Sequence, residues 1–403
     1  MEEKTKKTVK KATTTKKVQP SKDNVKSKVT NQKTKAKTEA KNTVKNVDVE
    51  KKTVAKKAAE KKVKTSSTKK VSETKAEKKQ VKKTAIKKTT TKEVTKAETS
   101  KSKKEDNKTN YPLNVKIWGY NQLVLNTNLY EEVDNAKAVV IIAHGMMEHS
   151  GRYDQFAKFL NKNSYIAITT DLRGHGQTAL SKEKLGFGEK DIFKETLIDL
   201  QGIVHFAKER FNLPIYLFGH SYGSLLSQRL IQICPDIEKC VLCGTTNGSA
   251  TIMKLGGMVC SLLSPFKGKT STGGMIEKMC IKSYGKKFKN GNWLTRDEKI
   301  FEEYQKDPYC GGTFPFSFYK SMIKNCNKNN DEIYKIGRKK IFLIVGSADP
   351  LSSGGKQVEK LHRIYLKRNI DSKLKIYKDA RHELLNEINK VEVWQDVIKF
   401  YNS

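Results

Sequence analysis

The first 110 residues lack almost every side chain from which a folded core is built. They contain no Phe, Tyr, Trp, Leu, Gly or Cys, and their only apolar residues beyond Met1 and scattered Ala are Val and Ile86. Such a segment cannot bury enough apolar surface to offset an ordering entropy of about 1–2 kcal/mol per backbone residue. We therefore predict a disordered tail over 1–110 and a folded domain over 111–403, which holds every aromatic residue and all seven Cys.

Most of the positive charge belongs to the N-terminal segment. Residues 1–110 contain 37 Lys, no Arg and 13 acidic residues, and so carry +24 of the formal net charge of +37. A Lys-rich chain attracts polyanions by counterion release, but without Arg or aromatic residues it lacks the groups that read or stack on bases. We expect nonspecific contact with nucleic acid, an anionic membrane surface or another polyanion. A tail that only aids solubility is the alternative.

Short β-branched runs alternate with helical patterns from residue 138 onward. Helical periodicity, as at 153–160 and 192–207, separates predicted strands at 138–142, 165–169, 215–218, 239–243, 340–345 and 374–377. This alternation predicts an α/β fold with an open, mostly parallel central sheet and helices on both faces.

The alternation stops between about residues 246 and 338, where helical patterning replaces strand patterning. Apolar residues recur at spacings of three and four from Ile252 to Phe266, which gives one broad apolar helical face. We interpret the whole segment as a helical cap inserted above the sheet. The apolar face is expected to pack on the core, to line an acyl pocket, or both.

The pentapeptide Gly219-His220-Ser221-Tyr222-Gly223 lies between a predicted strand and a predicted helix over 224–231. A strand, a sharp turn and a helix hold a serine Oγ exposed at the carboxyl edge of a sheet, and the glycines leave room for the strained backbone. Ser221 is therefore the candidate nucleophile. The side chain of His220 diverges from it on such a turn, so we expect His220 to pack nearby without reacting.

A serine hydroxyl needs a general base that is itself oriented by a carboxylate. In folds with this motif the acid and then the histidine follow the serine along the chain, which leaves His362 and His382 as candidate bases. We favour His382, in the loop after the last predicted strand, because His362 lies inside a predicted helix. For the acid we favour Asp349, on the loop after the strand at 340–345, and expect Asp379 to be a solvated or turn-forming residue.

The tetrahedral intermediate of acyl transfer needs two backbone N–H donors. The residue after the nucleophile, Tyr222, is expected to supply one. The other is expected from the loop after the strand that ends at Ala143, and we assign it to Met146, because Gly145 before it lets that N–H turn inward.

Several segments occur in a fixed order along the chain: 144–153 (HGMMEHSGRY), 171–176 (DLRGHG), 219–223 (GHSYG), 293–297 (WLTRD), 307–311 (DPYCG), 346–349 (GSAD) and 380–383 (ARHE). Together they resemble the monoacylglycerol lipase and lysophospholipase-like branch of the α/β-hydrolases, over roughly residues 115–400. The resemblance implies an α/β-hydrolase fold and hydrolysis of a single-chain lipid ester, with Met146 and Tyr222 as oxyanion donors. We expect the segment around Arg173 and His175 to fix loops.

Three functions stay open at this point. Hydrolysis of monoacylglycerol or lysophospholipid is the leading hypothesis, and a short-chain carboxylesterase or a peptidase on the same fold is the second. A polyanion-binding protein with an inactive hydrolase scaffold is the third.

The sequence points to chemistry without a cofactor. It contains no phosphate-binding glycine loop, no paired metal-ligand histidines and no nucleotide fingerprint, so we expect no metal and no cofactor. Cys240 and Cys243 lie three apart on a predicted strand, where their side chains face opposite sides, so we expect two buried small hydrophobic residues. An odd number of Cys, with no apolar leader after Met1, favours a reduced, cytoplasmic setting. Peripheral association with a membrane or the nucleoid is compatible with the tail.

Overall fold

The computed structural model describes residues 111–247, 268 and 271–403. The Lys-rich segment 1–110 and the apolar run from Ile252 to Phe266 lie outside the described residues. The disorder expected of the first and the packing expected of the second therefore stay predictions.

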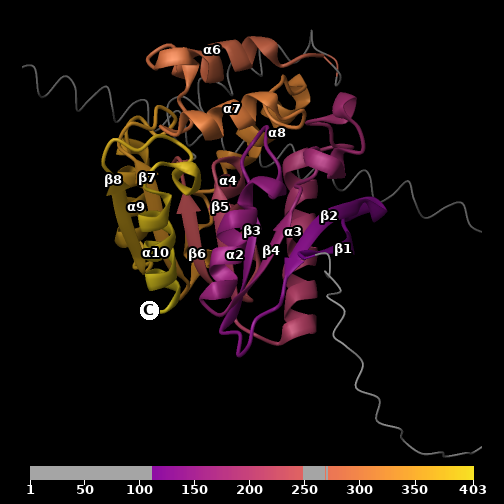
Figure 1. Ribbon diagram of the computed structural model, residues 1–403, viewed down its shortest axis with the longest axis vertical. Coiled ribbons are helices and arrows are strands. Elements are labelled where there is room, and N and C mark those ends of the chain that lie inside the picture. Colours follow the sequence, from indigo (N-terminus) through magenta and orange to yellow (C-terminus); the bar gives the residue numbers. More distant parts are fainter. Residues whose placement is uncertain (1–110, 248–267, 269–270) are drawn as a thin grey trace, which may run out of the picture. The chain divides into compact units, whose positions relative to one another are not determined.

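An eight-stranded sheet forms the centre of the described chain, in the order β1-β2-β4-β3-β5-β6-β7-β8 (Figure 1). Its strands are β1 (Leu113–Trp118), β2 (Val124–Tyr130), β3 (Ala138–Ala143), β4 (Tyr165–Thr170), β5 (Ile215–His220), β6 (Ile237–Cys243), β7 (Lys340–Gly346) and β8 (Ser372–Tyr377). β2 runs antiparallel to both of its neighbours, whereas the pairs from β4 to β8 are all parallel. The open, mostly parallel sheet predicted from the sequence is confirmed.

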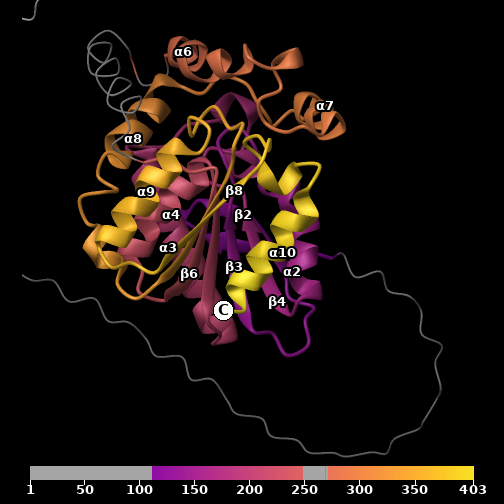
Figure 2. The same cartoon turned by 90° about the vertical axis from the view of Figure 1, so that its left-hand side faces the viewer.

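Helices cover both faces of the sheet because the central strands are apolar on both faces. All residues of β3, β4 and β5 are buried, and alternate residues of each strand enter two separate core clusters. One cluster includes side chains of α3 (Ile192–Phe211), α4 (Tyr222–Ile233) and α9 (Lys356–Lys367). The other includes side chains of α2 (Asp154–Lys162) and α10 (Lys390–Tyr401). Figure 2 shows these two sets of helices on opposite sides of the sheet.

The described part of the insertion between β6 and β7 is helical. It contains α6 (Gly274–Gly285), α7 (Glu298–Lys306) and α8 (Phe316–Cys326), and α6 and α7 lie above the sheet in Figure 1. α7 begins after Asp297, whose side chain accepts hydrogen bonds from the backbone N–H groups of Lys299 and Ile300. The insertion thus lies over the edge of the sheet formed by the carboxyl ends of its parallel strands. The loops that carry Ser221, Asp349 and His382 begin at this edge.

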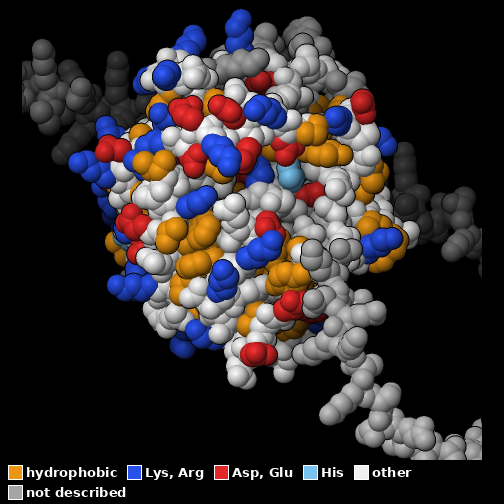
Figure 3. All heavy atoms as spheres, viewed as in Figure 1, with side chains coloured by type: hydrophobic (Ala, Val, Ile, Leu, Met, Phe, Trp, Pro, Cys, Tyr) orange, Lys and Arg blue, Asp and Glu red, His pale blue; other side chains and the backbone are white. Residues whose placement is uncertain are grey.

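Acidic and basic side chains are interspersed on the face shown in Figure 3, so the excess positive charge is not gathered into one patch there. Among the described residues, no helix has both the length and the apolar composition needed to cross a bilayer.

Candidate active site

Ser221 lies on a strained turn between β5 and α4. Its φ of 49° and ψ of −114° lie in a backbone region that residues other than glycine rarely adopt. Its N–H donates to the carbonyl of Cys243 at 2.9 Å. The close approach also requires Gly223, because a Cβ there would collide with the carbonyl oxygens of Ala143 and His144. The turn therefore lies directly against the carboxyl ends of β3 and β6.

Asp349 and His382 come together from two loops that are 33 residues apart in the chain. The His382 Nδ1 lies 3.1 Å from Asp349 Oδ2, and both side chains are almost completely buried. Burial by itself lowers the pKa of His382, but the charge of Asp349 and its hydrogen bond outweigh burial, so that the pKa is raised. The ring also packs on Gly244, the residue after the carbonyl that Ser221 contacts.

The alternative acid and base lie elsewhere. His362 is on α9, where its Nδ1 lies 3.1 Å from Ser372 Oγ. Asp379 is exposed, has a φ of 57°, and its N–H donates to Ser347 Oγ. Of the four candidates, the structure pairs only Asp349 with His382.

The loop after β3 adjoins the nucleophile. A Cβ on Gly145 would lie 3.3 Å from the Cβ of Ser221, and the next residue but one, Met147, has a φ of 60°. Among the described residues, none accepts a hydrogen bond from the Met146 N–H. The Tyr222 N–H is likewise without an acceptor there, since it opens α4 and has no partner in its own helix. Two free N–H donors therefore belong to residues next to Ser221 and Gly145.

The comparisons with known proteins agree with this geometry. A family model described as serine aminopeptidase, S33 (Hydrolase_4), matches residues 134–389. The chain belongs to this family. It is 25% identical to the monoglyceride lipase homolog of Monkeypox virus over 268 residues, which are 65% of this chain and 88% of that relative. It is also 25% identical to the monoglyceride lipase of Homo sapiens over 265 residues, 63% of this chain and 78% of that one.

Solved structures show the same fold. A thermostable carboxyl esterase from Bacillus coagulans matches with a TM-score of 0.66 at 22% identity, covering 72% of this chain and 97% of that one. The chain is thus an α/β-hydrolase of the monoacylglycerol lipase-like family, a hydrolase of the lipase and esterase type.

A buried network of charges braces the loops of this hydrolase from behind. Glu148 accepts hydrogen bonds from the Gly145 N–H at 2.6 Å and the Tyr153 hydroxyl at 2.9 Å, and it lies 3.0 Å from His220 Nδ1. Burial opposes ionisation of Glu148, but hydrogen bonding to His220 and the charge of Arg152 hold its pKa well below the usual range. The interpretation of His220 as a packing residue beside the nucleophile agrees with these contacts.

Arg152 joins the loop of Met146 to the loop of His382. Its guanidinium donates to Glu148 at 2.7 Å and binds Glu383 in a bidentate pair at 2.8 and 2.7 Å. Glu383 directly follows His382, whereas Glu148 holds the loop of Met146. One cation therefore couples the position of His382, the candidate base, to the loop of Met146, the candidate oxyanion donor.

A cap residue covers the candidate base. The ring of Trp293 lies over the His382 ring with centroids 4.9 Å apart and an angle of 33°. Both neighbours of His382 are bound to the same cap segment: Arg381 donates to the carbonyls of Asn292 and Thr295, and the Glu383 N–H donates to the Leu294 carbonyl. The sequence analysis noted this segment only as part of a resemblance, since a cap tryptophan carries no spacing signal that relates it to a histidine about 90 residues later.

The remaining motifs have structural roles. Arg173 forms a buried ion pair with Asp199 at 2.8 Å and donates to the Tyr120 carbonyl, which confirms the loop-fixing role. Cys240 and Cys243 are both buried and enter different core clusters on the two faces of the sheet, as predicted. Burial raises the pKa of both thiols.

Proposed function

We propose that this protein hydrolyses carboxylic esters of single-chain lipids, monoacylglycerol or lysophospholipid, through Ser221, His382 and Asp349 and an acyl-enzyme. The observation that carries the proposal is the buried pair of Asp349 and His382, whose ring packs on Gly244, next to the Cys243 carbonyl that accepts the N–H of Ser221 on its strained turn. The names of the viral and human relatives, both monoglyceride lipases, support the substrate class.

These positions support a reaction in the following steps. An ionised Asp349 only accepts hydrogen bonds, so it fixes the proton of neutral His382 on Nδ1 and leaves Nε2 free to act as the base. Ser221 Oγ attacks the ester carbonyl while Nε2 takes its proton, and the oxyanion is bound by the N–H groups of Met146 and Tyr222. Collapse expels the alcohol with that proton, and water then releases the fatty acid by the same steps.

Labelling by a fluorophosphonate probe tests the nucleophile. We expect the wild-type chain to be labelled and Ser221→Ala to remain unlabelled, with Ser403→Ala, at an exposed serine, as a control that keeps its label. A wild-type chain that is folded but unlabelled would favour the polyanion-binding protein with an inactive scaffold.

A series of p-nitrophenyl esters of rising chain length, followed by monoacylglycerol, lysophospholipid and aminoacyl amides, tests the substrate. We expect the highest kcat/KM with the long acyl groups. The family description as a serine aminopeptidase keeps a peptidase in the comparison, and a carboxylesterase is the other alternative. Highest kcat/KM with the shortest ester or with the amides would reject the lipase proposal.

We also propose that the Lys-rich segment 1–110 binds polyanions nonspecifically and that the protein is cytoplasmic, with peripheral contact to a membrane or the nucleoid. Its +24 charge supports this, because releasing many counterions makes binding strong at low salt and weak at high salt. Full-length protein and a chain that begins at Asn110 are compared for retention on DNA and on anionic vesicles. Equal retention of both chains would remove the segment from the proposal.

A further inference from the structure

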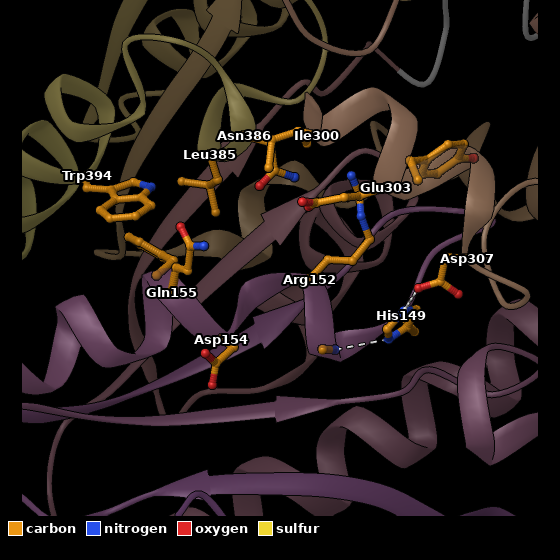
Figure 4. A pocket seen from close by; sticks show the side chains of 13 residues that line it. His149, Arg152, Asp154, Gln155, Ile300, Glu303, Asp307, Leu385, Asn386 and Trp394 are labelled. Carbon is orange, nitrogen blue, oxygen red and sulfur yellow. Dashed lines mark hydrogen bonds and ion pairs between the residues drawn. The ribbon is translucent and has the colours of Figure 1, made fainter. Parts of the chain in front are cut away.

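Three side chains with different metal-binding atoms meet where the cap touches the loop of Met146. One ligand atom from each of His149, Asp307 and Cys310 lies within 4.8 Å of the other two. His149 stands in the loop after β3, Asp307 ends α7, and Cys310 lies in the turn that follows. Figure 4 shows His149 and Asp307 facing each other at one end of a cavity of about 290 Å³.

The spacing of these atoms is close to that of a tetrahedral site. Zinc takes imidazole nitrogen, carboxylate oxygen and thiolate sulfur at ~2.0–2.3 Å, which puts the ligand atoms roughly 3.3–3.8 Å from one another. His149 Nε2 and Asp307 Oδ2 are 2.8 Å apart. Binding would therefore require the His149 and Asp307 atoms to separate by roughly 0.5 Å and the Cys310 Sγ, which lies within 4.8 Å of both, to approach by up to about 1 Å. The cavity beside His149 and Asp307 leaves room for a water molecule as the fourth ligand.

The surrounding charges favour a cation although the chain as a whole is strongly positive. The Arg152 guanidinium is close by, but Glu148 and Glu383 both lie 2.7 Å from it. Asp307 and Glu303 add two further carboxylates on the wall of the same cavity. Among the described residues that line this cavity, carboxylates thus outnumber Arg152, which is its one Lys or Arg.

The neighbouring backbone partly orients the ligands. The Tyr309 N–H donates to Asp307 Oδ1 at 2.8 Å and so leaves Oδ2 for a metal. His149 must change tautomer on binding, which costs its 3.2 Å hydrogen bond from the Gly151 N–H. Burial raises the pKa of the Cys310 thiol, so binding must also release its proton.

We propose that His149, Asp307 and Cys310 bind Zn²⁺ and thereby tie the cap to the loop of Met146. The two segments already touch, because the Gly311 N–H donates to the Met147 carbonyl at 2.9 Å. The metal would act on the arrangement of the cap and leave the ester chemistry to other residues. Sequence spacing alone does not suggest such a site, since His149 and Asp307 are 158 residues apart.

Metal binding to the full-length, untagged and metal-stripped chain tests this site. Zn²⁺ is titrated in competition with a chromophoric chelator, and Co²⁺ is added separately to detect the thiolate-to-cobalt charge-transfer band. We expect one equivalent of Zn²⁺ and a clear band. Loss of a ligand in Cys310→Ser should weaken Zn²⁺ binding by at least ~100-fold, since even loss of an outer-shell partner costs about 10–100-fold.

Two more variants make the result decisive. Asp307→Asn, at a partly exposed position, should weaken binding as well and guards against a folding defect in Cys310→Ser. Cys234→Ser, at a buried cysteine of another part of the fold, should leave binding unchanged. Absence of stoichiometric Zn²⁺ binding, or binding that survives both ligand variants, would overturn the site. Neither readout uses ester hydrolysis, so this outcome is separable from failure of the proposed function.

Discussion

Replacing Asp349 by Asn changes one charge at the centre of the candidate triad with little change in shape. Asp349 is completely buried, and Oδ1 also accepts the Leu351 N–H at 2.9 Å, a bond that an amide oxygen can keep. The amide that replaces Oδ2, however, offers an N–H to His382 Nδ1. Neutral His382 would then carry its proton on Nε2, where it cannot accept the serine proton.

The expected loss in kcat is about 10⁴-fold, the effect of the equivalent change in the chymotrypsin-type triad, or ~5.5 kcal/mol at about 1.4 kcal/mol per decade. KM should change little, because Asp349 is buried behind the imidazole. The pKa of His382 should fall, since the charge that opposes the burial effect is gone. The assay is kcat and KM for a p-nitrophenyl ester between about pH 5 and pH 9, with thermal unfolding as a check of the fold.

Asp379→Asn is the matched control. This carboxylate is in the same loop as His382 but is exposed, so kcat should stay within about twofold of the wild type. A loss of less than tenfold in Asp349→Asn, or equal losses in both variants, would refute the assignment of the acid.

Four further results are expected. Because the pKa of His382 is raised above its ordinary value of 6.5, kcat/KM should fall tenfold per pH unit below a midpoint higher than 6.5, and a midpoint below 6 would contradict the pairing. The raised pKa of His382 also adds to the free energy of unfolding. This contribution is fully present below pH 6.5 and is lost as pH rises through the pKa of the folded state, which urea unfolding at several pH values can measure. Arg152→Met leaves Glu148 and Glu383 buried without their cation and should lower the free energy of unfolding by about 3–5 kcal/mol; no loss would show that the bridge is dispensable. Trp293→Ala uncovers the His382 ring and should lower kcat more than it raises KM, whereas a change in KM alone would assign the ring to substrate binding.

The central strands and the loops at their ends were predictable because local sequence dictates them. β3 to β8 begin and end within two residues of the runs predicted from β-branched composition. Parallel strands bring their carboxyl ends to one edge, so the strand that precedes Asp349 and the strand that precedes His382 were enough to place these residues on neighbouring loops. The serine turn was recognisable because its backbone packs so closely that Gly219 and Gly223 leave no room for a Cβ. Few other sequence patterns have this requirement.

The sequence analysis missed β1 and β2. These strands lie at the edge of the sheet and are only partly buried, with Asn at positions 114, 126 and 128. Such strands lack the continuous apolar run that marks a doubly covered strand, and asparagine is depleted in strands. Their pairing is fixed by tertiary contacts, as between Thr127 and Thr170 at 3.0 Å.

The charged network was missed for another reason. Glu148, Arg152 and Glu383 stand in polar segments typical of solvated loops, yet the two glutamates are buried and the Arg152 side chain is only 11% exposed. A carboxylate is buried only when a partner compensates its desolvation, and here the partner of Glu383 is 231 residues away. Periodicity and composition describe neighbours in the chain and hold no information on such a pair.

Backbone hydrogen bonds join the cap to the loop of His382 and to the loop of Met146. The Glu383 N–H donates to the Leu294 carbonyl at 2.7 Å, which binds the histidine loop to the cap. The Gly311 N–H donates to the Met147 carbonyl at 2.9 Å, which binds the oxyanion loop to another part of the same insertion. A displacement of the cap must therefore break these bonds or carry both loops with it. Since the proposed base and the proposed oxyanion donor would act in the same transition state, cap variants should change kcat together with substrate binding.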